Sequence, residues 1–570
     1  MKGDFTRDTF DPAKHFSRVL MQQGRVTLDT DFNEQAAILL RYLRTLARYI
    51  IGAYAGPAGK DANGNVGGGF KLTKLDPDPN KGLFTISSGC YYVDGILVEN
   101  DADCAYATQP DYEPSSDDPL LKAPEGDVER FFIYLDVWEQ HITPIEDDSI
   151  RETALGGPNT CTRAKVVWQV RAAPVTAELW DEAQKAEEEN TNLLLDLYSQ
   201  KNKDLQEYIA AKTDKDRLPL LTEIQMLDES IERLTRLRGA SLHQILLNQL
   251  VRQKIPSLAA RVDPGRKTED ACVTPPASKY RGAENQLYRV EIHSGGNVGD
   301  NLPATFKWSR DNGSVATGWM GGEGNDLHVV STRGFAAGNW VELSDDNSEL
   351  LSIPGTLVQL VKVEGATVSV DPATTLPPIS DFPKNSKIRR WDQIATEAIS
   401  LANDNAVPIQ ESPANATPEQ IVWMDLEDGV QIQFSAGGDY RTGDYWLIPA
   451  RVATGNVEWP QADDLNPQPL PPHGIEHHYA LLGFASWPNQ QLNIENAQFE
   501  FSPLMSTVSE SALPVSHDFP LPHPVFPPPH PVFPLPHPVQ PLSPTPDAAP
   551  KKPPKARKRQ VKKSPASPPS

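Results

Sequence analysis

The chain is poor in cysteine and has no long apolar run, and these absences exclude several classes of protein. Its cysteines, Cys90, Cys104, Cys161 and Cys272, form no CxxC pair, so a zinc site is not predicted. We expect reduced thiols, with Cys90 and Cys104 as the alternative pair in a β-rich unit. No apolar stretch reaches the roughly 18 to 20 residues of a membrane span. The N-terminus MKGDFTRDTF lacks the apolar core of a signal peptide, which predicts cytoplasmic synthesis without general secretory export.

Motifs that mark common enzyme sites are absent as well. The sequence contains no GxSxG, HExxH or DxDxDG element, and the glycines at 67–69 and 295–296 lack the GKS/T ending of a phosphate-binding loop. We therefore predict no catalytic residue, no cofactor and no metal site, and we expect a protein that is not an enzyme.

A few groups of residues carry weaker chemical signals. His473, His477 and His478 suggest metal ligands, but the last two would point to opposite faces of a strand, which favours a structural role. The carboxylates that would suit a glycosidase, with turns as the alternative, are Glu427, Asp428, Asp439 and Asp444. The tryptophans expected mostly in the core, with a sugar-stacking surface as the alternative, are Trp308, Trp319, Trp340, Trp391, Trp446, Trp459 and Trp487.

Charge is distributed unevenly along the chain. The formal net charge is −23, but the last twenty residues hold eight bases and no acid, so the first 550 residues carry 45 bases against 76 acids. Because residues 1–550 are strongly acidic, they repel the phosphate backbone of nucleic acids. We expect nucleic acid to bind only weakly and only through the tail. The tail residues predicted to interact are Lys551, Lys552, Arg557, Lys558 and Arg559. Three seven-residue units at 521–541 (LPHPVFP, PPHPVFP, LPHPVQP) predict polyproline II or disorder.

The stretch at 11–52 carries the strongest local pattern. Asp31 followed by Glu34 is a capping-box signature, which predicts a helix that starts there and ends at Gly52. The apolar residues at helical spacing along it are Phe32, Ala36, Leu39, Leu40, Leu43, Leu46, Ala47 and Ile50. One face must therefore be covered, either by the chain's own β region or by another protein. We predict docking to another protein through Phe32, Leu39, Leu43 and Leu46.

Residues 176–256 differ in character from the rest. They are acidic, rich in alanine and leucine, and free of glycine before Gly239, which predicts helix for nearly the whole interval. The a/d spacing of a coiled-coil seam is carried by Leu220, Ile224, Leu227, Ile231 and Leu234. Pro219 stands just before this seam, so we predict a helical hairpin whose arms meet at about 213–219. The arms pack on each other, or the hairpin supplies one face of an oligomer.

Short segments with the patterns of antiparallel strands make up most of the remaining chain. The run FFIYLDVW at 131–138 predicts a buried strand, and 164–171 and 478–487 predict further strands. Residues 335–371 predict a small barrel or sandwich. An Asn-Gly turn at 312–313, between 306–308 and 315–319, predicts a type I′ hairpin.

Seven blocks of the sequence belong together. The stretch QQGRVTLDTDFNEQ at 22–35 follows the form QxGRVxLDxDxNEQ, and the others contain YRVEIH, FKWSRDNGSV, RRWDQ, LEDGVQ, GDYWLIPAR and GIEHHYA. Over about residues 1–490 the chain thereby resembles a bacterial family of uncharacterised domains associated with phage-tail-like and contractile injection particles. The resemblance implies association with such a particle and assigns no site.

These observations together predict a mainly β fold of small antiparallel sandwich or barrel units. The predicted fold also contains an N-terminal helix, an inserted long α-helical hairpin and a disordered proline-rich C-terminal tail. The predicted divisions are a motif and docking helix at 1–55, β-rich regions at 56–175 and 257–505, the helical hairpin at 176–256, and the tail at 506–570.

Three functional hypotheses follow. The first is a non-enzymatic structural or adaptor component of a phage-tail-like or contractile injection particle, released or cell-associated, with protein subunits as partners. The second is a carbohydrate-binding or carbohydrate-active module that meets a surface glycan. The third is a surface-tethering protein that acts through its basic tail.

Overall fold

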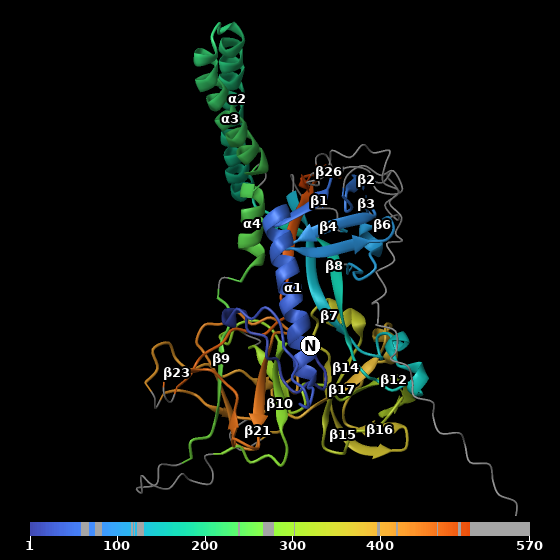
Figure 1. Ribbon diagram of the computed structural model, residues 1–570. Coiled ribbons are helices and arrows are strands. Elements are labelled where there is room, and N and C mark those ends of the chain that lie inside the picture. The colour runs from blue at the N-terminus through green and yellow to red at the C-terminus, as the bar shows by residue number, and fades with distance from the viewer. Residues whose placement is uncertain are drawn as a thin grey trace, which may run out of the picture. The chain divides into compact units, whose positions relative to one another are not determined.

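The computed structural model describes residues 1–58, 68–74, 83–115, 118, 120–121, 130–237, 240–252, 254–265, 279–300, 303–395, 400–417, 420–463, 466–487 and 492–501. All of them belong to one compact unit, residues 1–507 (Figure 1). Strands account for 34% of the structure and helices for 23%, which confirms the mainly β fold. The predicted disordered tail lies outside the described residues. No described helix combines the length and apolarity that crossing a membrane requires.

Three sheets share the first core. They are β27-β1-β4-β5, β2-β3-β6 and β26-β25-β7-β8. Their strands are β1 (Tyr54–Pro57), β2 (Leu72–Lys74), β3 (Phe84–Ile86), β4 (Gly89–Val93), β5 (Ile96–Asn100), β6 (Cys104–Ala105), β7 (Arg130–Ile142), β8 (Arg163–Val175), β25 (His478–Ser486), β26 (Asn493–Asn496) and β27 (Glu500–Phe501). The predicted strand at 131–138 lies within β7, buried between β8 and β25, as its continuous apolar run indicated. Segments near both ends of the described chain therefore build this core together.

A second core lies between the five-stranded sheet β18-β11-β10-β21-β22 and the sheet β19-β20-β9, near the ribbon β23-β24. The strands are β9 (Leu258–Val262), β10 (Gln286–Ser294), β11 (Thr305–Ser309), β18 (Val407–Pro408), β19 (Met424–Asp425), β20 (Val430–Phe434), β21 (Tyr445–Arg451), β22 (Asn456–Val457), β23 (Gln461–Asp463) and β24 (Asn466–Pro467). Large aromatic residues, among them Tyr288, Phe306 and Trp446, fill the space between the sheets.

A closed barrel forms the third core, in the order β12-β13-β16-β15-β14-β17. Its strands are β12 (Ala316–Glu323), β13 (Asp326–Val329), β14 (Trp340–Ser344), β15 (Thr356–Glu364), β16 (Thr367–Val370) and β17 (Lys387–Trp391). Closure leaves no unpaired edge around the ring, and Val341, Leu343 and Ile388 are fully buried inside it. The short helix α5 (Asp346–Leu350) connects β14 to β15. The barrel agrees with the prediction for 335–371.

The predicted hairpin at 306–319 is wrong. Asn312 and Gly313 do have the positive φ angles of a type I′ turn, 53° and 62°. However, β11 pairs with β10 and β18, whereas β12 pairs with β13 and β17. The turn therefore carries the chain from the second core into the barrel, because the flanking strands find their partners elsewhere in the sequence.

Three helices occupy the interval at 176–256. They are α2 (Ala177–Ala210), α3 (Asp214–Leu237) and α4 (Ala240–Leu250), and Figure 1 shows α2 and α3 side by side. The side chain of Thr176 caps α2 by accepting a hydrogen bond from the Leu179 amide. The arms of the hairpin meet at residues 211–213, slightly earlier than the predicted 213–219, because Pro219 lies inside α3. Leu246 of α4 is buried against Phe132, Tyr134 and Leu481, on the face of the sheet opposite to the first core, which anchors the helices to that sheet.

The N-terminal helix α1 (Asp29–Ile51) begins two residues before the predicted start. Its N-cap is Leu28, whose amide donates to the Asp31 carboxylate over 3.0 Å, so Asp31 plays the part that the prediction gave to Glu34. The helix ends at Gly52, as predicted, where φ is +104°. The described 3₁₀ turns are Pro12–Lys14, Tyr106–Thr108, Asp148–Ile150, Thr153–Leu155 and Ile379–Asp381.

Candidate functional site

Polar side chains hold the first half of α1 to the segment that precedes it. The Asp29 carboxylate accepts hydrogen bonds from the amide and the hydroxyl of Thr6. Burial would raise the pKa of Asp29, but these hydrogen bonds outweigh it and the pKa is lowered. The Glu34 carboxylate accepts from Thr9 over 2.6 Å, and the Gln35 side chain accepts from the amide of Val19 over 2.8 Å. Polar contacts therefore hold this part of α1 to the preceding segment.

The second half of α1 is held to the sheets in the same way. Arg44 pairs with Glu139 of β7 over 2.9 Å, and Arg48 pairs with Asp94 in the β4–β5 turn over 3.4 Å. A Cβ atom on Gly95 of that turn would lie 2.1 Å from the main-chain oxygen of Arg44, so only glycine permits this approach. Ile38 is the large apolar residue of α1 that is buried, with 1% of its surface exposed. Ion pairs and a close backbone contact fix the helix in place.

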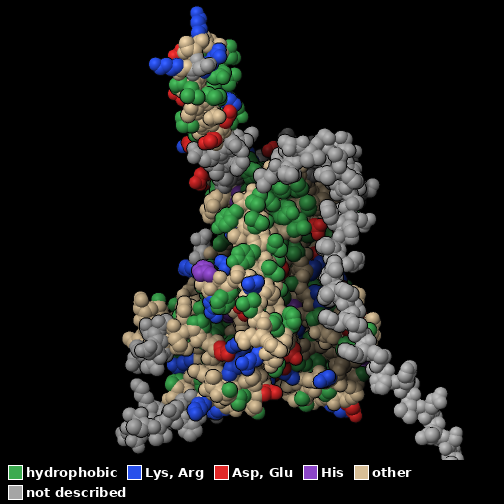
Figure 2. Space-filling view, in the orientation of Figure 1, with side chains coloured by type: hydrophobic (Ala, Val, Ile, Leu, Met, Phe, Trp, Pro, Cys, Tyr) green, Lys and Arg blue, Asp and Glu red, His purple; other side chains and the backbone are tan. Residues whose placement is uncertain are grey.

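The apolar side chains of α1 consequently face away from the molecule. Phe32, Leu39, Leu43 and Leu46, the residues predicted to dock, are exposed by 67%, 54%, 64% and 58%. With Ala36 and Ile50 they form the stripe 32, 36, 39, 43, 46, 50, whose spacings of 4, 3, 4, 3 and 4 residues match a coiled-coil seam. Figure 2 shows hydrophobic side chains gathered along this helix. We call this stripe the α1 seam.

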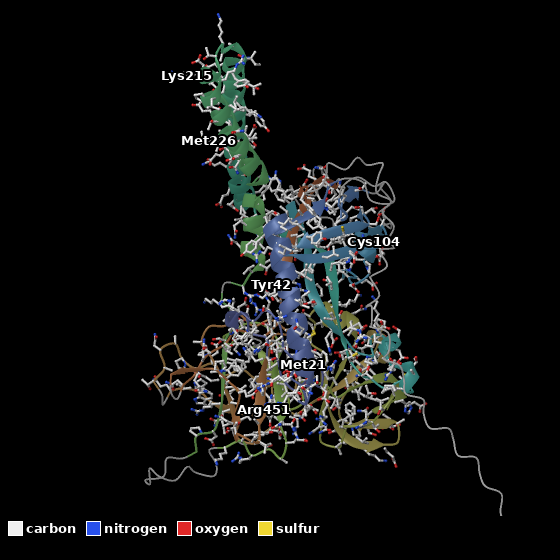
Figure 3. All side chains as sticks on the ribbon, viewed as in Figure 1. Met21, Tyr42, Cys104, Lys215, Met226 and Arg451 are labelled. Carbon is white, nitrogen blue, oxygen red and sulfur yellow. The ribbon has the colours of Figure 1, made fainter. Side chains whose placement is uncertain are left out.

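The segment before α1 enlarges the apolar surface. Its exposed large side chains are Phe16, Leu20, Met21, Val26 and Leu28. The chain turns at Gly24, where φ is +71° and the Arg25 amide donates to the Gln22 carbonyl. Figure 3 shows Met21 near the N-terminal end of α1 and Tyr42 along the helix.

The size of this surface is unusual for a free protein. Thirteen large apolar side chains between residues 16 and 50 are at least 40% exposed. If each side chain exposes on the order of 100 Å² of apolar surface, together they present roughly 1,000 Å². This area is above the 300 to 600 Å² of the largest apolar patch on a typical monomer. The surface includes Val26, Leu28 and Phe32 of the QxGRVxLDxDxNEQ motif, and it is the best candidate for a functional site.

The predicted seam of the helical interval lies on α3. Ile224 and Ile231 are buried, while Leu220, Leu227 and Leu234 are half-buried. An ion pair between Lys201 and Asp228 also joins α2 to α3. The predicted tail residues, Lys551, Lys552, Arg557, Lys558 and Arg559, lie outside the described residues.

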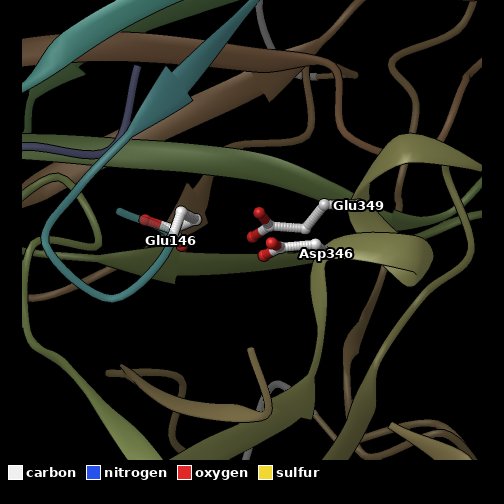
Figure 4. Close-up of side chains that lie close together, drawn as sticks. All are labelled: Glu146, Asp346 and Glu349. Atoms are coloured by element: carbon white, nitrogen blue, oxygen red, sulfur yellow. The ribbon is translucent and has the colours of Figure 1, made fainter. Parts of the chain in front are cut away.

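Three carboxylates converge near the barrel and present a candidate metal centre. One oxygen each of Glu146, Asp346 and Glu349 lies within 4.8 Å of the others (Figure 4). The Lys387 ammonium occupies their centre, at 2.6 Å from Glu146, 3.0 Å from Asp346 and 2.9 Å from Glu349. Its side chain is 0% exposed. A lysine therefore already supplies the cation that these carboxylates require.

The pKa values follow from this arrangement. Burial would lower the pKa of Lys387, but its three carboxylate partners raise it above the usual range, so the ammonium stays charged. Burial acts in the opposite sense on Glu146 and Glu349, yet attraction to Lys387 lowers the pKa of both. Only Asp346, in which burial prevails, has a raised pKa. Lys2 and Arg389 also pair with Glu349, at 3.4 Å and 3.8 Å, so three cations face three carboxylates. The cluster is a balanced ion network that joins β17 and α5 to the loop after β7.

A cavity of about 250 Å³ lies beside this network. Its charged walls are paired with one another: Arg289 with Glu291 at 2.6 Å, Lys307 with Glu342 at 2.5 Å, and Lys2 with Glu291 at 3.3 Å. Burial would raise the pKa of Glu342, but Lys307 lowers it to about 2. A charged ligand would have to break these pairs, which makes the cavity a weaker candidate than the α1 surface.

The three histidines that the sequence suggested as metal ligands contact different protein groups. His477 bonds Asp136 at 2.7 Å and His478 bonds Asp94 at 3.0 Å. His473 accepts from the Leu447 amide at 3.3 Å. Each histidine thus has its own protein partner.

Two of the carboxylates considered for a glycosidase pair with separate arginines. Glu427 pairs with Arg310 at 2.7 Å, and Asp444 pairs with Arg252. Asp428 has a φ of 49° and forms a turn with Gly429, while the main-chain oxygen of Asp439 accepts from Arg252. Of the seven tryptophans, five are buried, and Trp340 and Trp487 are half-buried. None of these seven forms an exposed stacking surface.

Sequence reasoning missed Glu146, Glu349 and Lys387. They lie far apart in the chain, in segments with no shared motif, and only the fold brings them together. The acidic run Asp345-Asp346-Asn347 includes one member of the cluster, but its first carboxylate caps α5 by accepting from the Ser348 amide at 2.8 Å, which is a structural role.

Comparison with known proteins gives one extensive match. A family model described as "Family of unknown function (DUF6519)" matches residues 1–491. No curated protein matches the chain. A solved structure described as "Crystal structure of TssK" aligns with 67% of this chain and 96% of that chain, at 8% sequence identity and a TM-score of 0.14. A score this low supports no inference about the chain.

Proposed function

The chain belongs to this family of unknown function, and we propose that it acts as a structural or adaptor component of a larger protein assembly of the phage-tail-like or contractile injection kind. The observation that carries the proposal is the α1 surface. A helix that binds its own protein through polar groups, and presents its apolar side outward, suits a component that another protein subunit covers.

The energetics favour an occupied surface over an empty one. Burying apolar area is worth about 25 cal/mol per Å², so roughly 1,000 Å² represents a gross gain on the order of 25 kcal/mol, before the substantial costs of association. Leu39 and Leu43 lie at the middle of the α1 seam, where a partner would exclude water most completely. The sequence motif of residues 22–35 spans the turn before α1 and its first turns, so part of the motif lies on this same surface.

Charging the seam tests the proposal. The variant with Leu39→Glu and Leu43→Glu, expressed in the producing cell, should move from high-mass fractions to the size of the free protein in native-size fractionation. A matched control is Thr45→Glu, since Thr45 is exposed on α1 but lies outside the seam. The far-ultraviolet circular dichroism of both variants should match that of the unchanged protein. If the unchanged protein itself occurs only at the size of a free chain, the proposal is wrong.

A further inference from the structure

We propose that the α1 seam pairs with the α1 seam of a second copy of this chain, in antiparallel orientation, to form a two-fold symmetric dimer. The inference rests on the proposed function only in that it names the first occupant of the same surface. Four features of the described helix support it: the seam spacing, the residues that flank the seam, the helix dipole, and the area available for burial.

The seam is complementary to itself when one copy is reversed. In antiparallel coiled coils each a position meets a d position of the other helix. With the two-fold axis at the middle of the seam, Phe32 meets Ile50, Ala36 meets Leu46, and Leu39 meets Leu43. All six positions are then filled, and the small Ala36 lies opposite the large Leu46. A parallel pair would instead place Ala36 opposite Ala36 and leave a gap that costs stability.

The positions beside the seam carry no charge that would oppose a second copy. They are Asn33, Gln35, Leu40, Tyr42, Ala47 and Tyr49. In coiled coils these flanking positions usually hold the charges that select or reject a partner. Here Leu40 and Tyr42 lie closest to the proposed axis, so each would meet its own equivalent in an apolar contact. The neutral flanks thus remove the usual barrier to pairing of identical helices.

The helix dipole favours the reversed orientation. Antiparallel pairing opposes the dipoles of the two helices, whereas parallel pairing would align them. The charged side chains of α1 do not enter the pairing, because they already have partners in the same chain: Asp29 accepts from Thr6, Arg44 pairs with Glu139, and Arg48 pairs with Asp94.

The available area meets the requirement of a stable dimer. Eight large apolar side chains of α1 are exposed: Phe32, Leu39, Leu40, Tyr42, Leu43, Leu46, Tyr49 and Ile50. At on the order of 100 Å² each they offer roughly 800 Å² per copy, the area that one partner buries in an interface of standard size. The helix is already anchored by its ion pairs, so dimerisation does not have to order it.

Site-specific crosslinking of the full chain tests the orientation. Leu40→Cys, introduced with Cys161→Ser and Cys272→Ser, should yield a covalent dimer with a short bismaleimide, because each Leu40 lies near the axis. Leu46→Cys in the same background should not crosslink to itself, since the two equivalent positions are about 15 Å apart along the axis. A mixture of Ala36→Cys and Leu46→Cys proteins should crosslink. Efficient self-crosslinking of Leu46→Cys would overturn the antiparallel arrangement.

Sedimentation of the purified chain tests self-pairing itself. The unchanged protein should show a dimer, and Leu39→Glu with Leu43→Glu should raise the dimer dissociation constant about 1,000-fold, because four leucines lose burial. A monomer at every accessible concentration would refute the pairing. If that monomer still loses its place in the larger assembly on charging of the seam, the proposed function stands while the self-pairing fails. If the charged variant remains in the assembly, the docking role of α1 fails as well.

Discussion

Removal of the Lys387 ammonium should strongly destabilise the barrel. Lys387→Met keeps much of the aliphatic length of the side chain but leaves Glu146, Asp346 and Glu349 without their shared cation. Breaking a buried ion pair by removing one partner typically costs about 3 to 5 kcal/mol, because the remaining charge is buried and uncompensated. Three carboxylates share this lysine, and its side chain is fully buried, so we expect a loss in the upper part of that range.

The destabilisation should depend on pH with a definite sign. In the unchanged protein the pKa values of Glu146 and Glu349 are lowered, so the stability that they contribute is fully present above their unfolded pKa and is lost as pH falls through the folded pKa. Without Lys387, burial prevails at Glu146 and raises its pKa above the unfolded value of about 4.3. Glu349 keeps Lys2 at 3.4 Å and Arg389 at 3.8 Å, so its pKa changes less. The free energy of unfolding of the variant is then lowered at neutral pH, and it rises again as the carboxyl groups take up protons at lower pH. The difference between the two proteins should therefore be largest at about pH 7 and should shrink toward about pH 4.

Urea unfolding followed by tryptophan fluorescence measures this difference, because Trp319 and Trp391 lie in barrel strands and are buried. Lys362→Met is the matched control. Lys362 also lies in a barrel strand and pairs with a glutamate, Glu364, but that pair is exposed, so its loss should leave the unfolding midpoint unchanged. A loss below about 1 kcal/mol for Lys387→Met, or a difference that grows in acid, would refute the description of the cluster as a balanced ion network.

Three further substitutions probe how the elements are held. Gly95→Ala would place a Cβ atom against the Arg44 main chain, so the rate of amide hydrogen exchange across residues 42–48 should rise by tenfold or more. Gly338→Ala should leave that rate unchanged, because Gly338 has a similar positive φ but open space around it. Arg252→Met should lower the free energy of unfolding in urea by about 3 to 5 kcal/mol, because its partner Asp444 is buried. The control is Arg7→Met, since Arg7 pairs with Glu458 at an exposed site. An effect of Arg252→Met no larger than that of the control would contradict this. Burial lowers the pKa of His243 to about 4, so the stability that this histidine provides is complete above its unfolded pKa of about 6.5 and is lost as pH falls toward 4. Hydrogen exchange in α4, corrected for intrinsic rates, should therefore accelerate from pH 7 to pH 5, and His243→Gln should remove this pH dependence.

Local patterns predicted the elements whose sequence matches their final environment. The continuous apolar run of β7 indicated a strand covered on both faces, and the short strands at 335–371, broken by Gly, Pro and Asp, indicated a small barrel. The turn at Asn312-Gly313 shows the limit of such reasoning. A dipeptide determines the φ angles of a turn, but the partners of the strands on either side depend on residues elsewhere in the chain, here those of β10 and β17.

The candidate site was predictable only in part. The spacing of Phe32, Leu39, Leu43 and Leu46 indicated an apolar stripe, but an amphipathic helix usually turns that stripe inward. The outward orientation depends on contacts from remote segments, namely Thr6 with Asp29, Glu139 with Arg44, and Asp94 with Arg48. No local pattern encodes these pairs. The same reason explains why the carboxylates around Lys387 were not predicted.

The placement of β25 beside β7 has a consequence for the order of events during synthesis. β7 ends at residue 142, yet the strand that covers it begins at residue 478, and β27, which pairs with β1, lies at 500–501. A ribosome that adds about 5 to 20 residues per second needs on the order of 20 to 70 seconds to make the intervening chain. During that delay β8 can pair with one edge of β7, but the other edge lacks its partner β25. The barrel, whose strands all lie between 316 and 391, can close as soon as it emerges. The early part of the chain is thus completed last, and a product that stops before residue 478 would leave its first core open to proteases and chaperones.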